Sequence, residues 1–254
     1  MRTHRYCSLD TNSFNLRCDT SNQDSPKLFI ENGNIDIYNI SDSELRIGTI
    51  VSNRCYNQSG FVARYRSSIN LEGYDAFTFS AKNMFTVIGS DDYALINDTN
   101  GFTSGCFALC QKEPNVPFGQ CSGNGCCQIS IPKGLSYYNS RLYTLQKHID
   151  VWFFNECGYG FLVEEGSYEF NSASDLNTSH DDFINKIEST MPIVVDWVIK
   201  SNGTCTAEVN ECKENSLCYD VEGSGGYRCK CINGYEGNPY LHPGCQGTSL
   251  FHFN

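Results

Sequence analysis

Several features of membrane proteins, enzymes and metalloproteins are missing from this sequence of 254 residues. No apolar run approaches the roughly 18 residues that a membrane-spanning helix needs, and the first residues lack the apolar core of a secretory signal. There is no Cys-X-X-Cys pair, which argues against a metal site. No Gly-X-Ser-X-Gly, His-Glu-X-X-His, P-loop or dinucleotide-binding motif occurs, so we expect no catalytic residues and no enzyme.

Cysteine, by contrast, is abundant, with 15 in the chain. Such a density persists only where disulfides are stable, which indicates a secreted or cell-surface protein. An oxidised chain without an export signal is expected to be a piece of a longer precursor or the product of an incomplete gene model. Because 15 is odd, at least one cysteine lacks an intramolecular partner or bonds to another chain.

The net charge of −11 is distributed unevenly along the chain. Residues 1–90 carry nine basic and nine acidic side chains, whereas residues 91–254 carry nine basic and twenty acidic ones. Nucleic acid is therefore excluded as a partner of the acidic part. An anionic ligand should prefer the first third of the chain.

The distribution of apolar residues predicts a mainly β fold: a disulfide-rich antiparallel domain with one short helix. Asn32-Gly33 is a hairpin turn signal. Ser179 is expected to cap a helix over 179–187 whose apolar residues share one face. The expected strands are residues 27–30, 35–40, 44–51, 77–80, 84–88, 93–96, 128–131, 141–146, 151–154, 159–163 and 193–199.

A cysteine cluster at residues 121–127 is the most distinctive stretch. Three of its seven residues are cysteines, two of them adjacent, and glycines between them permit tight turns. We interpret it as a cross-linked loop that leads into a strand, and not as a metal-binding loop. The pairing in the large domain stays open for Cys7, Cys18, Cys55, Cys106, Cys110, Cys121, Cys126, Cys127 and Cys157.

Basic residues cluster in one place, at Arg54, Arg64 and Arg66. In an extended segment Arg64 and Arg66 share one face and Tyr65 lies on the other. These arginines are either solvated side chains at a strand edge or a carboxylate-binding patch, because a guanidinium group matches a carboxylate in a bidentate manner.

Other polar motifs are less informative. The adjacent acids Asp91-Asp92 and Glu164-Glu165 could suggest a glycosidase, but neighbouring acids usually lie on opposite strand faces or in solvated turns. Five sequons fit an exported protein without proving export, and they make candidate glycosylation sites of Asn39, Asn57, Asn97, Asn177 and Asn202.

Composition changes at residue 201, beyond which large apolar residues become rare. Six cysteines follow at positions 205, 212, 218, 229, 231 and 245. Spacing alone leaves fifteen possible pairings. So short a segment without a core needs such cross-links to fold.

An ordered series of motifs resembles the ectodomain of plant wall-associated receptor kinases. In the large domain it comprises Cys55-Tyr56, Phe77-Thr-Phe-Ser80 with Asn83, Gly105-Cys106 with Cys110, the cluster at 121–127, Ile131-Pro132-Lys-Gly, Phe161-Leu-Val and residues 192–197. In the tail it comprises Tyr227-Arg-Cys-Lys-Cys231, Gly234-Tyr-Glu-Gly-Asn-Pro-Tyr-Leu241 and Gly244-Cys245. The series covers nearly the whole chain.

The resemblance implies a galacturonan-binding β domain over residues 1–200, an EGF-like module over 201–247 and a tail over 248–254. It also implies the pairs Cys205–Cys218, Cys212–Cys229 and Cys231–Cys245. The transmembrane helix and the kinase of the family are absent from this sequence. Calcium is not expected in the module, because Asn210-Glu211 precedes its second cysteine and not its first.

One departure from the family pattern bears on the odd number of cysteines. Ser90 follows Gly89 at a position where the family commonly has cysteine. We therefore expect one unpaired cysteine among Cys106, Cys110, Cys121, Cys126, Cys127 and Cys157. The family also usually has a further cysteine-containing segment before the equivalent of Cys7.

The expected function is binding of pectin, or polygalacturonate, at the cell-wall side of the plasma membrane. Arg54, Arg64 and Arg66 would pair with carboxylates, and Tyr56 or Tyr65 would stack on sugar rings. No cofactor is expected, and calcium would act only as a bridge to the ligand. The alternative is a protein-interaction ectodomain or secreted decoy that binds a peptide or a partner receptor through the EGF-like tail.

Overall fold

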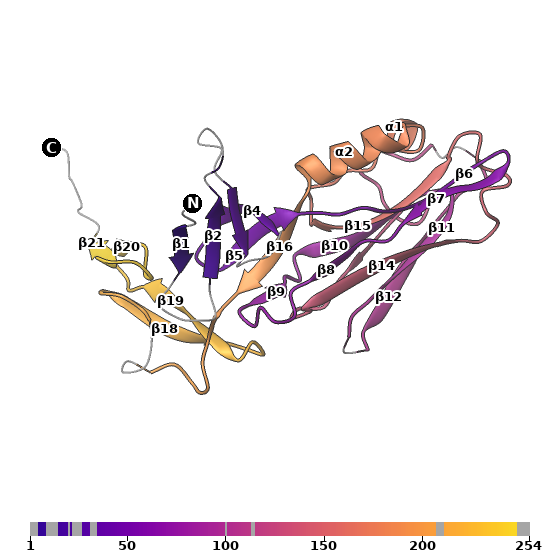
Figure 1. Cartoon of the computed structure of the whole chain (residues 1–254). Coiled ribbons are helices and arrows are strands. Elements are labelled where there is room, and N and C mark those ends of the chain that lie inside the picture. The colour runs from indigo at the N-terminus through magenta and orange to yellow at the C-terminus, as the bar shows by residue number, and fades with distance from the viewer. Residues whose placement is uncertain are drawn as a thin grey trace. The chain divides into compact units, whose positions relative to one another are not determined.

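The computed structural model describes residues 5–8, 15–19, 21, 27–30, 35–99, 101–112, 115–206 and 211–247 (Figure 1). Antiparallel strands dominate it, which confirms the prediction of a mainly β fold. None of the helices in this described part is long and apolar enough to cross a membrane.

The chain forms two compact units that alternate along the sequence. Unit 1 comprises residues 1–45, 73–77 and 196–254, and unit 2 comprises residues 46–72 and 78–195. Three strands have residues in both units, namely β5 (Glu44–Gly48), β9 (Phe77–Phe79) and β16 (Pro192–Trp197). The predicted domain boundary after residue 200 stays a prediction.

In unit 1 the N-terminal strands pair in chain order, from β1 to β5. The register opposes Cys7 to Leu16 and Leu28 to Ile37. Asn32-Gly33, the expected turn between β3 and β4, lies outside the described residues. The bounds of the first four strands are β1 Arg5–Ser8, β2 Asn15–Asp19, β3 Lys27–Ile30 and β4 Asp36–Ile40.

Unit 1 also contains the cystine module, which we define as residues 205–245. The structure pairs Cys205 with Cys218, Cys212 with Cys229 and Cys231 with Cys245, the three pairs that the resemblance implies. Tyr240 anchors the module, because its hydroxyl oxygen accepts a hydrogen bond from the Cys229 backbone N–H and lies 3.2 Å from both the Asp42 and the Cys229 carbonyl oxygens, to either of which its O–H can donate. The strands of this region are β17 Ile199–Lys200, β18 Ser216–Val221, β19 Gly226–Cys231, β20 Tyr235–Gly237 and β21 Cys245–Gly247.

Unit 2 consists of two sheets. One has the order β13-β10-β15-β6-β7 and the other β12-β11-β14-β8. Gly160 of β15 lies where a side chain would meet Ser140, Leu142 and Ala94, so its missing side chain lets the two sheets approach. The strands are β6 Ser52–Asn57, β7 Gly60–Tyr65, β8 Ser68–Asn70, β10 Asn83–Ile88, β11 Asp91–Asn97, β12 Thr103–Leu109, β13 Cys126–Ser130, β14 Tyr137–Thr144 and β15 Cys157–Glu164.

Helix α2 (His180–Thr190) lies alongside the sheet that contains β15 (Figure 1). As predicted, the Ser179 side chain caps it by accepting a hydrogen bond from the Asp182 backbone N–H. Phe183 stacks on Tyr159 with ring centroids 4.1 Å apart, and Ile187 is also buried. Fully burying a side chain of this size contributes about 2–3 kcal/mol.

Three predictions about local structure were wrong. A second helix, α1 (Ser172–Asp175), was not expected. Residues 151–154 form turns and not a strand, since the Val151 and Trp152 backbone N–H groups donate to the His148 carbonyl. Strands β1 and β2 were not among the expected strands, because their polar sequences carry no apolar alternation.

Candidate functional site

The predicted basic residues lie on a hairpin formed by β6 and β7. Arg54 and Arg64, ten positions apart in sequence, are direct cross-strand partners. Strand β7 is the edge strand of its sheet, so one of its sides has no neighbouring strand among the described residues. The structure therefore brings together two of the three predicted arginines at an accessible edge.

A β-bulge determines which aromatic ring accompanies these arginines. The register passes from Cys55 opposite Ala63 to Tyr56 opposite Phe61, which leaves Val62 as the extra residue. Phe61 therefore shares the face of Arg64, although simple alternation would place it with Tyr65 on the other face. Phe61 is 58% exposed and was not predicted as a site residue.

Arg54 is held in place by aromatic rings. Its guanidinium carbon lies 5.5 Å from the centroid of Tyr56 and 5.8 Å from that of Phe61, within the range of a cation–π contact. Tyr56 is only 1% exposed, and its hydroxyl lies 3.3 Å from Thr144 Oγ1. A ring as buried as that of Tyr56 does not fit the expected stacking of a sugar on it. Tyr56 instead holds the Arg54 guanidinium group through the cation–π contact.

Arg64, Tyr65 and Arg66 are all exposed. Tyr65 pairs with Asn53 and so lies on the opposite face of the strand from Arg64. Arg66 follows the end of β7, two residues beyond Arg64. We call Arg54, Phe61, Arg64 and Arg66 the arginine face.

The charges of the arginine face have no acidic partners within the described part of the chain. Arg54, Arg64 and Arg66 each lack a carboxylate oxygen within 4.0 Å among those residues. Arg46 shows the contrast, because it donates to both carboxylate oxygens of Glu164 at 2.8 and 2.5 Å. These hydrogen bonds hold the pKa of Glu164 below its usual range. Arg46 thus has a structural partner, whereas the arginine face does not.

The cysteine cluster is a disulfide network. Cys106 bonds to Cys127, and Cys121 bonds to Cys126. Cys126 and Cys127 are adjacent on strand β13, so their side chains point to opposite faces and reach different partners. The cluster is therefore structural, as the sequence indicates.

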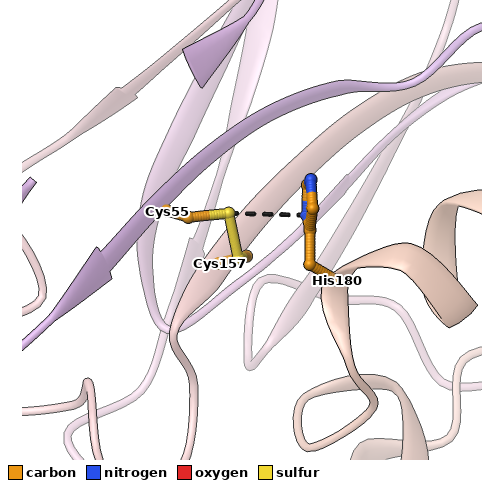
Figure 2. Close-up of side chains that lie close together, drawn as sticks. All are labelled: Cys55, Cys157 and His180. Carbon is orange, nitrogen blue, oxygen red and sulfur yellow. Dashed lines mark hydrogen bonds between the residues drawn. A yellow bond between two sulfur atoms is a disulfide. The ribbon is translucent and has the colours of Figure 1, made fainter. Parts of the chain in front are cut away.

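The third disulfide of unit 2 joins Cys55 to Cys157, directly opposite each other on β6 and β15. Figure 2 shows His180 beside it, with Nδ1 3.5 Å from Cys55 Sγ. Three ligand-type atoms thus lie together, but a sulfur in a disulfide lacks the negative charge of a metal-binding thiolate. In this oxidised form the group is a disulfide next to an imidazole and not a metal site.

Cys110 is the remaining cysteine of unit 2, and it is unpaired. Its Sγ donates to Ser90 Oγ over 3.0 Å, and its backbone N–H donates to the Ser90 carbonyl. This confirms the prediction that one of the six named cysteines has no partner, and it places that cysteine next to Ser90. Burial raises the pKa of the Cys110 thiol, which lowers its reactivity at neutral pH.

A buried polar pair lies nearby in unit 2. His148 Nε2 is 3.1 Å from Asp92 Oδ1, and His148 Nδ1 is 2.8 Å from the Asn155 carbonyl oxygen. The carbonyl only accepts, so Nδ1 carries a proton, and the proton between Nε2 and Asp92 is shared by the pair. Both side chains are fully buried, so the pair organises the core and is inaccessible to a substrate.

Four of the five candidate glycosylation sites are exposed, namely Asn39, Asn57, Asn177 and Asn202, and Asn97 is half-buried.

Cys7 and Cys18 lie on the paired strands β1 and β2. Asn210, part of the calcium argument, lies outside the described residues.

Comparison with known proteins identifies relatives. The chain is 38% identical over 239 residues to wall-associated receptor kinase 2 of Arabidopsis thaliana, 34% over 245 residues to wall-associated receptor kinase 5 and 31% over 242 residues to wall-associated receptor kinase 4 of the same plant. Each match includes 92% of this chain but only 30 to 31% of the relative. No protein-family model and no solved structure matches the chain.

A disulfide-linked antiparallel β unit with a cystine-rich module is the architecture of an extracellular domain. More specifically, over 92% of its length the chain is similar to the ectodomain part of wall-associated receptor kinases, and it spans about 30% of the length of these relatives. The matched part lies outside the kinase of these relatives. The chain is thus related to the extracellular part of these receptors.

Proposed function

We propose that this chain binds acidic cell-wall polysaccharide, with de-esterified pectin as the ligand, through the arginine face. The observation that carries the proposal is a set of three arginines without acidic partners, within the described residues, on the edge of a domain in a chain of net charge −11. Relatives whose names associate them with the wall support this ligand class.

The chemistry of the face suits a uronate chain. The exposed guanidinium groups of Arg64 and Arg66 would form bidentate pairs with ring carboxylates. Phe61 offers a free ring face to the C–H groups of a pyranose, which carry partial positive charge toward the negative ring face. Arg54 would add a preorganised charge, because Tyr56 and Phe61 already hold its guanidinium group.

The test is affinity for oligogalacturonate of the double variant Arg64→Ala, Arg66→Ala. We expect binding about tenfold weaker at low salt, since two exposed ion pairs of about 0.5–1 kcal/mol each are lost. The salt dependence of the remaining binding should also flatten, because fewer charges are screened.

The matched control is Lys112→Ala, Lys133→Ala, which removes the same charge from two exposed lysines elsewhere in unit 2. Unchanged affinity in the arginine variant, or an equal loss in the lysine variant, would remove the site assignment. A chelator arm tests calcium, which enters the proposal only as a bridge between the ligand and acidic groups. Binding of a peptide or partner receptor by residues 201–247 stays a prediction.

A further inference from the structure

A row of stacked aromatic rings crosses the second sheet of unit 2. Phe107 of β12, Tyr93 of β11 and Tyr143 of β14 are consecutive cross-strand partners. The ring centroid of Tyr93 lies 5.1 Å from that of Phe107 and 5.1 Å from that of Tyr143. The angle between the ring planes is 24° in the first pair and 13° in the second. At this separation stacked rings are offset, so part of each ring stays uncovered by its neighbour. We call these three residues the aromatic ladder.

The ladder faces solvent and not the core. Its neighbours along β11 and β14, Ala94 and Leu142, are buried, and alternation places the ladder on the opposite face of the sheet. Phe107 lies on β12, the edge strand of its sheet, and its side chain is 53% exposed. The Tyr93 and Tyr143 hydroxyl groups have no hydrogen-bond partner among the described residues. Ring faces and free phenols are thus presented together.

The charge on this face is positive close to the ladder. Arg141 lies two residues from Tyr143 on the same face, is exposed, and has no described carboxylate within 4.0 Å. Asp91, the acidic residue of β11 on this face, is 8% exposed and accepts hydrogen bonds from the backbone N–H groups of Gln146 and His148. These backbone N–H groups partly offset its negative charge.

The two ends of the ladder's face differ. Beyond Leu109 and Leu145 lies a hollow of about 700 Å³ whose lining includes Asp91 and Asp150. Toward Leu95 the face carries Arg141, which is the cross-strand partner of Leu95. An anion is favoured at the Arg141 end and disfavoured at the acidic hollow.

We propose that the aromatic ladder and Arg141 form a second binding surface for the same class of ligand, a chain of uronic-acid pyranose rings. The inference rests on the proposed function, but it uses residues of the other sheet. Pyranose rings stack on the ladder, above all on Phe107. The free phenols of Tyr93 and Tyr143 form hydrogen bonds with sugar hydroxyls, and Arg141 pairs with a ring carboxylate. The combination of stacking, phenols and one unpaired cation favours this ligand over a purely apolar partner.

The experiment measures affinity for two probes, an oligogalacturonate and the same oligomer with its carboxylates methyl-esterified. We expect Phe107→Ala to weaken binding of both by about fivefold, because stacking does not depend on charge. Arg141→Gln should weaken only the acidic probe, by a similar factor. Phe107→Trp should keep both affinities, since it preserves a ring face.

Phe118→Ala is the matched control, because Phe118 is 66% exposed and lies outside the ladder. The affinity of this variant for both probes should equal that of the wild type. If Phe107→Ala binds both probes like the wild type while Arg64→Ala, Arg66→Ala loses binding, the ladder proposal is overturned and the proposed function stands. If the wild type binds neither probe, both are overturned. If Phe107→Ala keeps its affinity but turns a dimer into a monomer in light scattering, the ladder is an interface between copies of the chain.

Discussion

The cystine module and unit 2 achieve a fixed structure by different means. In the module, three disulfides link a segment that buries few large side chains, chiefly Tyr227 and Tyr240. Unit 2 has three disulfides as well, but they accompany a continuous buried core that includes Tyr159, Phe161 and Phe183. The same bond therefore has different consequences: covalent links replace a core in one region and supplement a core in the other.

The largest expected effect comes from removing one disulfide in each region. The pair of changes Cys212→Ser, Cys229→Ser should cost the module about 3–4 kcal/mol, enough to unfold a segment with so small a core. Hydrogen exchange should then show loss of protection over residues 211–247. Cys55→Ser, Cys157→Ser should lower the stability of unit 2 by about 4 kcal/mol or more, yet its strands should stay protected because the core remains. Equal loss of protection in both variants would contradict the comparison.

A second prediction concerns the polar pair inside the core of unit 2. His148→Ala should cost about 3–5 kcal/mol, measured by urea unfolding near pH 7, because it leaves the Asp92 carboxylate buried without a cation. Asp92→Asn is the control; a neutral His148 can accept a hydrogen bond from Asn at this position, so the loss should be much smaller.

The same pair gives the second prediction a pH dependence. Burial alone lowers the pKa of His148, but the charge and hydrogen bond of Asp92 outweigh this effect, so the pKa of His148 is raised. The pKa of Asp92 is raised as well, chiefly because burial disfavours its charged form. The folded state therefore holds the shared proton more tightly than the unfolded state. This stability is fully present below the unfolded histidine pKa of about 6.5 and is lost as pH rises through the folded value. In Asp92→Asn this dependence of the unfolding free energy on pH should disappear. If it persists, another titrating group causes it.

The structure of the arginine face and the ladder shows how much sequence could predict. Strands with alternating sequence, such as β4, and the capped helix α2 were found from local pattern. The pairing of Arg54 with Arg64 and the place of Phe61 depend on strand register and on one bulge, which no local pattern encodes. The ladder joins residues 93, 107 and 143, so only long-range register brings them together.

Some errors have equally specific causes. Residues 151–154 are apolar enough for a strand, but they form turns in which Val151 and Phe154 are buried singly while Phe153 is 68% exposed. The arginines were found because charge composition is local, whereas the burial of Tyr56 depends on contacts with Phe61 and His148. Composition thus suggested a kind of candidate site, whereas tertiary contacts determine which side chains are exposed on it.

The smallest effect concerns Cys110, where unit 2 lacks a bond that its geometry permits. Ser90→Cys should form a disulfide with Cys110, whose Sγ lies 3.0 Å from Ser90 Oγ. We expect the unfolding free energy to rise by about 2–3 kcal/mol, as for a loop of this length. Thiol titration in denaturant should find the Cys110 thiol in the wild type and not in the variant. A variant that keeps this thiol under oxidising conditions would show that the two positions do not meet in solution.

The link between Cys55 and Cys157 also constrains the order of events during synthesis. The two residues are separated by 102 positions, and at about 5–20 residues per second the ribosome takes roughly 5–20 seconds to pass from one to the other. Cys106, Cys110, Cys121, Cys126 and Cys127 all emerge in that interval. Before its own partner is made, Cys55 can thus meet these five cysteines as well as Cys7 and Cys18, which are synthesised earlier. The register of β6 with β15 must therefore select Cys157, the last cysteine of the unit to appear.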